Sequence, residues 1–343
     1  MRAKGMTYDT GFVRMGEISR ERFDPEVVRR ELTIIRDDLR CNAVQLIGGD
    51  PDRLERAAGY AAELGLEVWF SPYPLELSPG EILALFTDCA ERAERLRTRG
   101  AEVVFVTGVE LSIMNRGFVP GDGVDERLGL LLGQPSERRR ERLAEVSVGV
   151  NAFLRDAVAV VRERFRGRIT YCAIPFEQPD WTLFDIMSVE LIRSAEVASQ
   201  YREAIRKLVA SGMPVAITGF GASTFQGAGD RGGRGMEIIE YDEETGAPAR
   251  LNEEYIRDEA DQAEYLREVL EIFGTEGVDS TFVFLFALDS LPHRPDGDPR
   301  DDLDMASPGI VKVLEGGRHG DTYPDMTWEP KAAFTAVAEC YRG

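Results

Sequence analysis

The feature that most constrains the fold is the regular alternation of short apolar runs with longer amphipathic stretches along the whole chain of 343 residues. This alternation is typical of a parallel sheet whose strands are joined by crossover helices. Strands are expected at Ala3–Tyr8, Asn42–Ile47, Glu67–Ser71, Val103–Thr107, Ile169–Ile174, Asp185–Val189, Val215–Thr218 and Thr281–Phe286. Helices are expected near 25–38, 51–64, 79–99, 137–165, 195–211, 253–273 and 330–341. The pattern predicts an α/β fold, a single (β/α)8 TIM barrel forming one domain over residues 1–343.

Local signals support several of the helix starts. Ser78-Pro79-Gly80-Glu81 combines an N-cap serine, a proline at the first helical position and a glutamate placed to close a capping box. One crossover is short, because only about ten residues separate the fifth and sixth strand candidates, close to the lower limit for a parallel connection. A short turn of helix around Pro179–Leu183 is therefore expected there.

Long polar segments follow the fourth, seventh and eighth strand candidates, over 111–136, 219–251 and 287–329. In a barrel of this kind all three would lie at the C-terminal ends of the strands, where the βα loops build active sites. Loops of this length in compact domains are usually functional or disordered. They predict a pocket beneath the loops, and we expect it to be the only large pocket.

The composition excludes several classes of partner. A formal net charge of −20 argues against nucleic acid and anionic membranes, which require clustered positive charge. No run approaches the roughly 18 apolar residues of a membrane span, and the first residues lack the apolar segment of a secretory leader. The cysteines, at positions 41, 89, 172 and 340, are far apart, so disulfides and a cysteine metal site are not expected. We predict a soluble, cytoplasmic protein.

Neither a metal nor a cofactor is expected. The acidic run from Asp296 to Asp304 does not match the spacing of an EF-hand calcium loop. The glycine-rich segment Gly227–Gly235 lacks the Gly-Lys-Ser/Thr ending of a phosphate-binding loop. The two histidines, His293 and His319, both lie in the last long loop, and no Ser-His-Asp or Cys-His grouping is visible.

Carboxylates gather at the predicted C-terminal ends of the strands. Glu110, Glu177 and Glu190 are the candidate catalytic residues, although each could be a salt-bridged structural residue, Glu190 with Arg193 in particular. Paired acids can protonate and displace at an acetal carbon, and aromatic rings stack on sugar faces. These residues indicate a small, neutral, carbohydrate-like substrate. The candidate substrate-binding residues are Tyr8, Tyr73, Trp181, Asp289 and Trp328.

With an acid after the fourth strand, Pro214–Gly221 at the seventh and Phe282–Phe286 at the eighth, the chain resembles the clan A glycoside hydrolase barrels. The resemblance implies retaining β-glycosidase chemistry, with Glu110 as the acid/base residue, although Val109 replaces the asparagine that usually precedes it. The expected nucleophile position holds Gly219 in Thr218-Gly219-Phe220-Gly221. Gly227–Gly235 and Asp301–Ser307 are also similar to uncharacterised bacterial barrel proteins labelled abortive-infection proteins.

Glycine cannot attack an anomeric carbon, so four interpretations of Gly219 stay open. The chain could be an engineered inactive variant, use a displaced nucleophile such as Glu177 or Glu190, follow an inverting or substrate-assisted mechanism, or catalyse another reaction on the same scaffold. The lead hypothesis is a glycoside-hydrolase-like enzyme. The alternatives are a lyase, isomerase or cyclase that uses Glu110 and Glu177, and a carbohydrate-binding protein without activity. If Gly219 replaces an ancestral nucleophile, Gly219→Glu should create or raise hydrolysis of an aryl β-glycoside, and an external anion such as azide or formate should enter the vacant space.

Overall fold

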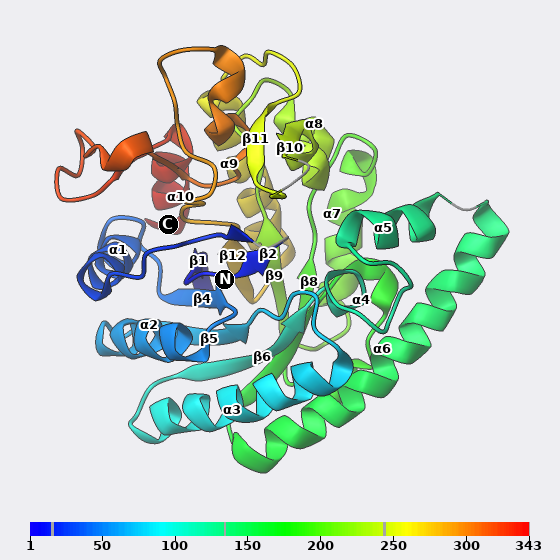
Figure 1. Cartoon of the computed structure of the whole chain (residues 1–343). Helices are drawn as coiled ribbons and strands as arrows, with labels where there is room; N and C mark the ends of the chain where they lie inside the picture. Colours follow the sequence, from blue (N-terminus) through cyan, green and yellow to red (C-terminus); the bar gives the residue numbers. More distant parts are fainter. Residues whose placement is uncertain (15–16, 134, 243–244, 343) are drawn as a thin grey trace.

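In the computed structural model, which describes residues 1–14, 17–133, 135–242 and 245–342, eight parallel strands close into a barrel (Figure 1). Each strand pairs with its neighbours in the order β1-β12-β9-β8-β7-β6-β5-β4. The strands are β1 (Ala3–Asp9), β4 (Ala43–Gly48), β5 (Glu67–Pro72), β6 (Val103–Val109), β7 (Arg168–Ala173), β8 (Met187–Glu190), β9 (Val215–Phe220) and β12 (Ser280–Val283). The predicted (β/α)8 barrel is confirmed.

The crossover helices surround the strands (Figure 1). They are α1 (Pro25–Asp37), α2 (Pro51–Glu63), α3 (Pro79–Thr98), α6 (Ser136–Arg164), α7 (Ala198–Val209), α9 (Glu259–Glu276) and α10 (Ala332–Arg342). The capping box at the start of α3 is confirmed, because the Glu81 carboxylate accepts hydrogen bonds from the backbone N–H and the hydroxyl of Ser78. The short crossover between β7 and β8 contains the predicted helical turn, a 3-10 turn over Trp181–Leu183.

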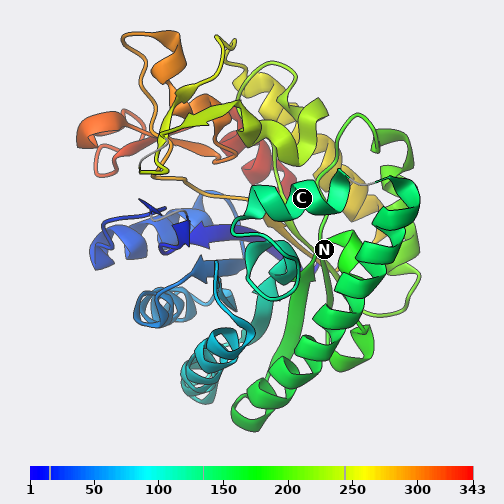
Figure 2. The same ribbon diagram turned by 45° about the vertical axis from the view of Figure 1, so that its right-hand side comes forward.

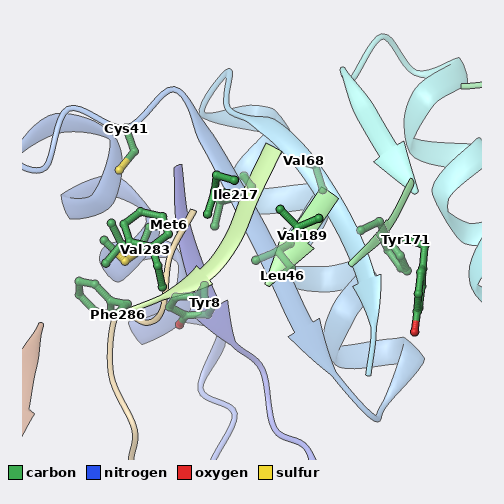
Figure 3. Packing of buried hydrophobic residues seen from close by; sticks show 14 of the residues in the cluster. Met6, Tyr8, Cys41, Leu46, Val68, Tyr171, Val189, Ile217, Val283 and Phe286 are labelled. Carbon is green, nitrogen blue, oxygen red and sulfur yellow. The ribbon is translucent and has the colours of Figure 1, made fainter. Parts of the chain in front are cut away.

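Side chains alternate across the barrel wall with the period of two that strands impose. On β1, Met6 and Tyr8 belong to the apolar layer between strands and helices, as Figure 3 shows. Ala3 belongs instead to a separate buried cluster, with Trp69 and Phe282, that fills the inside of the barrel. The strand residues that face inward near the C-terminal ends are therefore those that can reach a site.

The eighth strand is shorter than predicted. β12 ends at Val283, after a shift of its register with β9 between Phe282 and Val283. The chain beyond still bonds to the neighbouring strands, since the Phe284 N–H donates to the Phe220 carbonyl and the Phe286 N–H donates to the Thr7 carbonyl. The apolar run 281–286 thus stays at the barrel wall, but its last residues leave the regular ladder.

The three long loops contain structure of their own. The loop after β6 holds α4 (Leu111–Met114) and α5 (Val124–Leu132), and the loop after β9 holds α8 (Ala228–Arg231), a 3-10 segment over Gly232–Ile238, and the β10 (Ile239–Tyr241) and β11 (Pro248–Leu251) hairpin. The loop after β12 ends in the pair β13 (Val311–Val313) and β14 (Trp328–Pro330). In Figure 2 the yellow and orange segments lie together above the barrel. They share a small buried apolar cluster that includes Phe225, Leu251, Leu288 and Leu303.

Ion pairs fix the last of these loops. The Asp304 carboxylate accepts from Lys331 and from Arg257, each at 2.9 Å, and Asp302 pairs with Arg257 at 2.9 Å. Two members of the acidic run are therefore neutralised by cationic side chains. Among the described residues, no helix is both long enough and apolar enough to cross a membrane.

Candidate active site

A cavity of about 190 Å³ lies at the C-terminal ends of the barrel strands. Its polar lining includes two of the predicted catalytic residues, Glu110 and Glu190, and the predicted substrate-binding residue Tyr73. Most of the other lining is apolar: Phe12, Ile47, Leu75, Val109, Met114, Ile192, Met236, Phe284 and Leu288. We call this the acid-pair cavity.

Glu110 follows β6 directly and turns the chain into α4. Its backbone adopts the left-handed conformation, with φ of 46°, which is uncommon for a residue other than glycine. The Glu110 N–H donates to the Cys172 carbonyl at 2.9 Å, and its own carbonyl accepts from Met114 at 3.1 Å. These bonds hold the backbone of the turn, while the partly buried carboxyl group lines the cavity.

Glu190 ends β8, and Thr218 pairs with it on the neighbouring strand β9. The Thr218 hydroxyl donates to Oε1 of Glu190 at 2.6 Å. A Cβ added at Gly219 would fall on Oε2 of Glu190, so the carboxylate of Glu190 fills the space that the glycine leaves. Arg193, which might have neutralised Glu190, instead pairs with Glu268 at 2.6 Å.

The expectation of a vacancy beside Gly219 is therefore wrong. Gly219 has φ of 69°, a conformation that disfavours any residue with a Cβ, and the space in front of it is occupied. A glutamate introduced at Gly219 would meet Glu190 before it reached the cavity. The carboxylate of Glu190, on the neighbouring strand, stands at the Cβ position of residue 219, so an external anion has no room there.

Glu177 lies outside the barrel wall, where it is fully buried and does not line the acid-pair cavity. Its Oε1 accepts from the Ser112 N–H at 3.0 Å and from the Ser112 hydroxyl at 2.6 Å. Its Oε2 accepts from the Tyr171 hydroxyl at 2.7 Å and from the Ile174 N–H at 3.1 Å. The Tyr171 hydroxyl in turn accepts from the Leu111 N–H at 2.9 Å. Glu177 thus braces the turn that carries Glu110.

The electrostatics separate the three acids. Burial raises the pKa of Glu110 to about 8, and the negative charge of Glu177 adds to the rise. Burial, and then the charge of Glu110, raise the pKa of Glu190 well above its usual range, while the hydrogen bond from Thr218 opposes this rise. Burial also raises the pKa of Glu177, but its four hydrogen bonds favour the ionised form. Two neighbouring carboxyl groups that resist ionisation are the arrangement expected of an acid/base pair.

Two of the proposed substrate-binding residues face away from the cavity. Tyr8 occupies an outward position on β1, and its hydroxyl hydrogen-bonds to Glu31 of α1. The Trp328 indole N–H donates to the other oxygen of Glu31 at 2.9 Å, and the Trp328 ring is buried. Both side chains therefore belong to the layer between β1, α1 and the last loop.

The remaining two candidates also lie outside the acid-pair cavity. Trp181 packs against Phe184, with ring centroids 5.8 Å apart. Asp289 lies 3.7 Å from Arg20 and lines a second hollow of about 760 Å³, which we call the polar crevice. The expectation of a single large pocket is wrong, because the last loop encloses this crevice beside the barrel mouth as well.

Sequence reasoning missed several residues of the cavity. Thr7 on β1 and Gln45 on β4 line it and contact each other at 3.4 Å. Both are polar residues at inward positions of their strands, so the alternation along each strand could have identified them. Thr218, which donates to Glu190, carries the same signal on β9, whereas Met236 and Leu288 carry none, since their roles depend on how the loops are placed.

The geometry can be compared with solved structures. The chain aligns over its full length with a GH113 β-1,4-mannanase, 99% of which is covered, at a TM-score of 0.57 and 14% identity. The β-mannanase AaManA from Alicyclobacillus acidocaldarius, also of GH113, gives a TM-score of 0.56 at 15% identity, with 99% of this chain and 97% of that one covered. Cel5A of Thermotoga maritima gives a TM-score of 0.51 at 11% identity, with 89% of this chain and 97% of that one covered. The chain shares the (β/α)8 barrel fold of these structures.

At these identities the likeness concerns the fold alone. Neither a protein-family model nor a curated protein sequence matches the chain. In the barrel of this chain, Glu110 follows the fourth strand, Glu190 ends the sixth, and Gly219 lies on the seventh. What the site does must therefore be argued from its own residues.

Proposed function

We propose that this protein hydrolyses a small glycoside in the acid-pair cavity, with Glu110 as general acid/base and Glu190 as nucleophile. The observation that carries the proposal is the position of the Glu190 carboxylate in the space left by Gly219. It supplies an acid beside the seventh strand, where the resemblance to clan A barrels predicts the nucleophile. In this proposal Glu177 holds the turn that follows Glu110 and takes no direct part in the reaction.

The proposed division of roles draws on the electrostatics of the two acids. A general acid must hold its proton near neutral pH, and the pKa of Glu110 is raised to about 8. A nucleophile must ionise, and the hydrogen bond from Thr218 favours the ionised form of Glu190 against the burial and the charge of Glu110, which raise its pKa. Glu190 then attacks the anomeric carbon while Glu110 protonates the leaving oxygen. Water, deprotonated by Glu110, next releases the sugar from Glu190.

The proposal can be tested with a panel of aryl β-glycosides. Glu110→Gln and Glu190→Gln should each lower turnover about 100-fold or more. The leaving group of a 2,4-dinitrophenyl glycoside needs little protonation. With such a substrate, Glu110→Gln should slow the first step less than it does with other aryl glycosides, whereas Glu190→Gln should slow it as much. Glu63→Gln is the matched control, because Glu63 lies exposed on α2 in an ion pair with Arg29. Unchanged turnover in Glu190→Gln would refute the assignment.

One observation favours a second function. The acid-pair cavity offers few hydrogen-bonding groups for a polyhydroxylated ring, since most of its lining is apolar. A lyase or isomerase that moves a proton at carbon could use Glu110 and Glu190 as acid and base in such surroundings. Exchange of a substrate C–H proton with solvent deuterium, without hydrolysis, would identify this function. Sugar binding without turnover would indicate a binding protein.

A further inference from the structure

The acid-pair cavity continues outward through a narrower hollow. It shares Phe12, Met236 and Leu288 with a neighbouring cavity of about 70 Å³, which we call the neck. The neck in turn shares Ser19 and Ser290 with the polar crevice of about 760 Å³. Because neighbouring hollows share lining residues, the three lie in a row from the two glutamates to the outer crevice.

The neck is apolar. None of the described residues that line it carries a charge, and its larger side chains are Phe12, Ile18, Met236, Tyr241, Leu288 and Leu291. The Ser19 hydroxyl, one of its few polar groups, already accepts a hydrogen bond from the Phe12 N–H at 2.9 Å. A sugar ring placed here would lose hydrogen bonds to water that the walls do not replace. A hydrocarbon group would instead gain from leaving water.

The crevice beyond the neck has the opposite character. It is lined by Arg20, Arg22, Arg294 and Asp289 among other polar residues. The group nearest the two acids therefore meets an apolar wall, and charged side chains begin only farther out. Met236 lines both the acid-pair cavity and the neck, as well as a third adjoining hollow of about 110 Å³.

We propose that the substrate is a glycoside with an apolar aglycone, an aryl or alkyl group that lies in the neck. This inference rests on the proposed function, because an aglycone exists only if a glycosidic bond is cleaved. In the reaction, the bond between the anomeric carbon and the aglycone oxygen breaks and that oxygen takes the proton of Glu110. Water supplies the hydroxyl group of the sugar product. The apolar alcohol or phenol then leaves through the crevice.

The first test measures binding without turnover. 2-Naphthol is titrated calorimetrically into the wild type, Met236→Gln and Met236→Leu. We expect Met236→Gln to weaken binding about tenfold, because it places an amide in the apolar wall, and Met236→Leu to bind nearly as the wild type does. Val148→Gln is the matched control for an apolar-to-amide change, since Val148 is exposed on α6. Equal affinity for the wild type and Met236→Gln would overturn the neck as the binding site.

The second test measures kcat/KM for β-glucosides with methyl, butyl, hexyl, phenyl and glucosyl aglycones. The proposal predicts a rise of at least about tenfold from methyl to hexyl, lost in Met236→Gln, and a poor rate for the disaccharide. Hydrolysis with no dependence on the aglycone, or with preference for the disaccharide, would overturn the inference and leave the glycosidase function standing. Binding of 2-naphthol that depends on Met236, with no glycoside of any sugar hydrolysed, would support the apolar neck and overturn the glycosidase function.

Discussion

Glu190 and Gly219 lie on neighbouring barrel strands, and the carboxylate of one occupies the space in which the side chain of the other would stand. The two positions therefore depend on each other. Glu190 can take its place only because residue 219 has no Cβ, and residue 219 is held in a conformation that suits glycine, with φ of 69°.

Gly219→Ala should consequently damage both the site and the fold. The methyl group displaces Glu190, and the left-handed backbone adds a strain of about 1–2 kcal/mol. We expect a loss of at least about 1 kcal/mol in the free energy of unfolding and a fall in turnover of about tenfold or more. Urea unfolding and initial rates measure the two effects, and Gly212→Ala is the control. Gly212 also has a positive φ, of 81°, but an added Cβ there meets open space. A Gly219→Ala enzyme as active as the wild type would show that Glu190 is not in position for catalysis.

Thr218→Val should shift the pH dependence of activity. The Thr218 hydroxyl donates to Glu190, and this hydrogen bond opposes the rise in the pKa of that carboxyl. Without it the pKa of Glu190 rises further, so the activity that needs ionised Glu190 begins at a higher pH. In a plot of kcat/KM against pH, the acidic limb should therefore move to a higher pH by about 1 unit. If the acidic limb does not move in a folded variant, the Thr218 hydroxyl does not affect the ionisation that this limb reports.

Glu110 should make the protein less stable as the pH rises. Its pKa is about 8 in the folded state against 4.5 ordinarily, so between these values the folded chain keeps a proton that the unfolded chain has released. The free energy of unfolding therefore falls as the pH increases through this window. Glu110→Gln removes the effect, and its advantage over the wild type should grow by about 1 kcal/mol or more from pH 5 to pH 8. Parallel stability curves for the two proteins would contradict a raised pKa.

Trp328→Phe should affect stability without affecting the substrate. The indole N–H donates to buried Glu31, and the ring packs against Phe286 with centroids 5.2 Å apart. Loss of the hydrogen bond leaves an oxygen of a buried carboxylate without its partner and should cost about 1–3 kcal/mol. KM should stay within about twofold of the wild type. A large rise in KM with unchanged stability would instead show that Trp328 binds the substrate.

The sequence predicted the barrel because each strand and helix carries its own periodic pattern. The position of Glu110 was predictable for the same reason, since it directly follows a fully apolar strand. Tyr8 was placed wrongly on the assumption that a residue near a strand end faces the site, and Trp328 because it falls in a long loop on the site side. On β1 the side of each residue is set by the alternation, which directs Tyr8 toward α1 and Thr7 toward the cavity.

Glu177 and Glu190 could not be separated by sequence, because both follow short strands and both have polar neighbours. Their difference arises from tertiary contacts. Ser112 and Tyr171 use both oxygens of Glu177 outside the barrel, whereas a missing side chain on the next strand makes room for Glu190 inside the site. The neck was equally hidden, since Phe12, Met236 and Leu288 come from three separate loops.

Covalent trapping tests the central claim most directly. A 2-deoxy-2-fluoro glycoside with a 2,4-dinitrophenyl leaving group slows release of the sugar from the nucleophile, so the intermediate accumulates and peptide mapping by mass spectrometry locates it. The sugar is the one best hydrolysed in the aryl glycoside panel. Our account predicts one fluorosugar per chain, attached to Glu190 and absent in Glu190→Gln. A fluorosugar on Glu177 or any other residue, or a product with inverted anomeric configuration from an enzyme that forms no adduct, would contradict it.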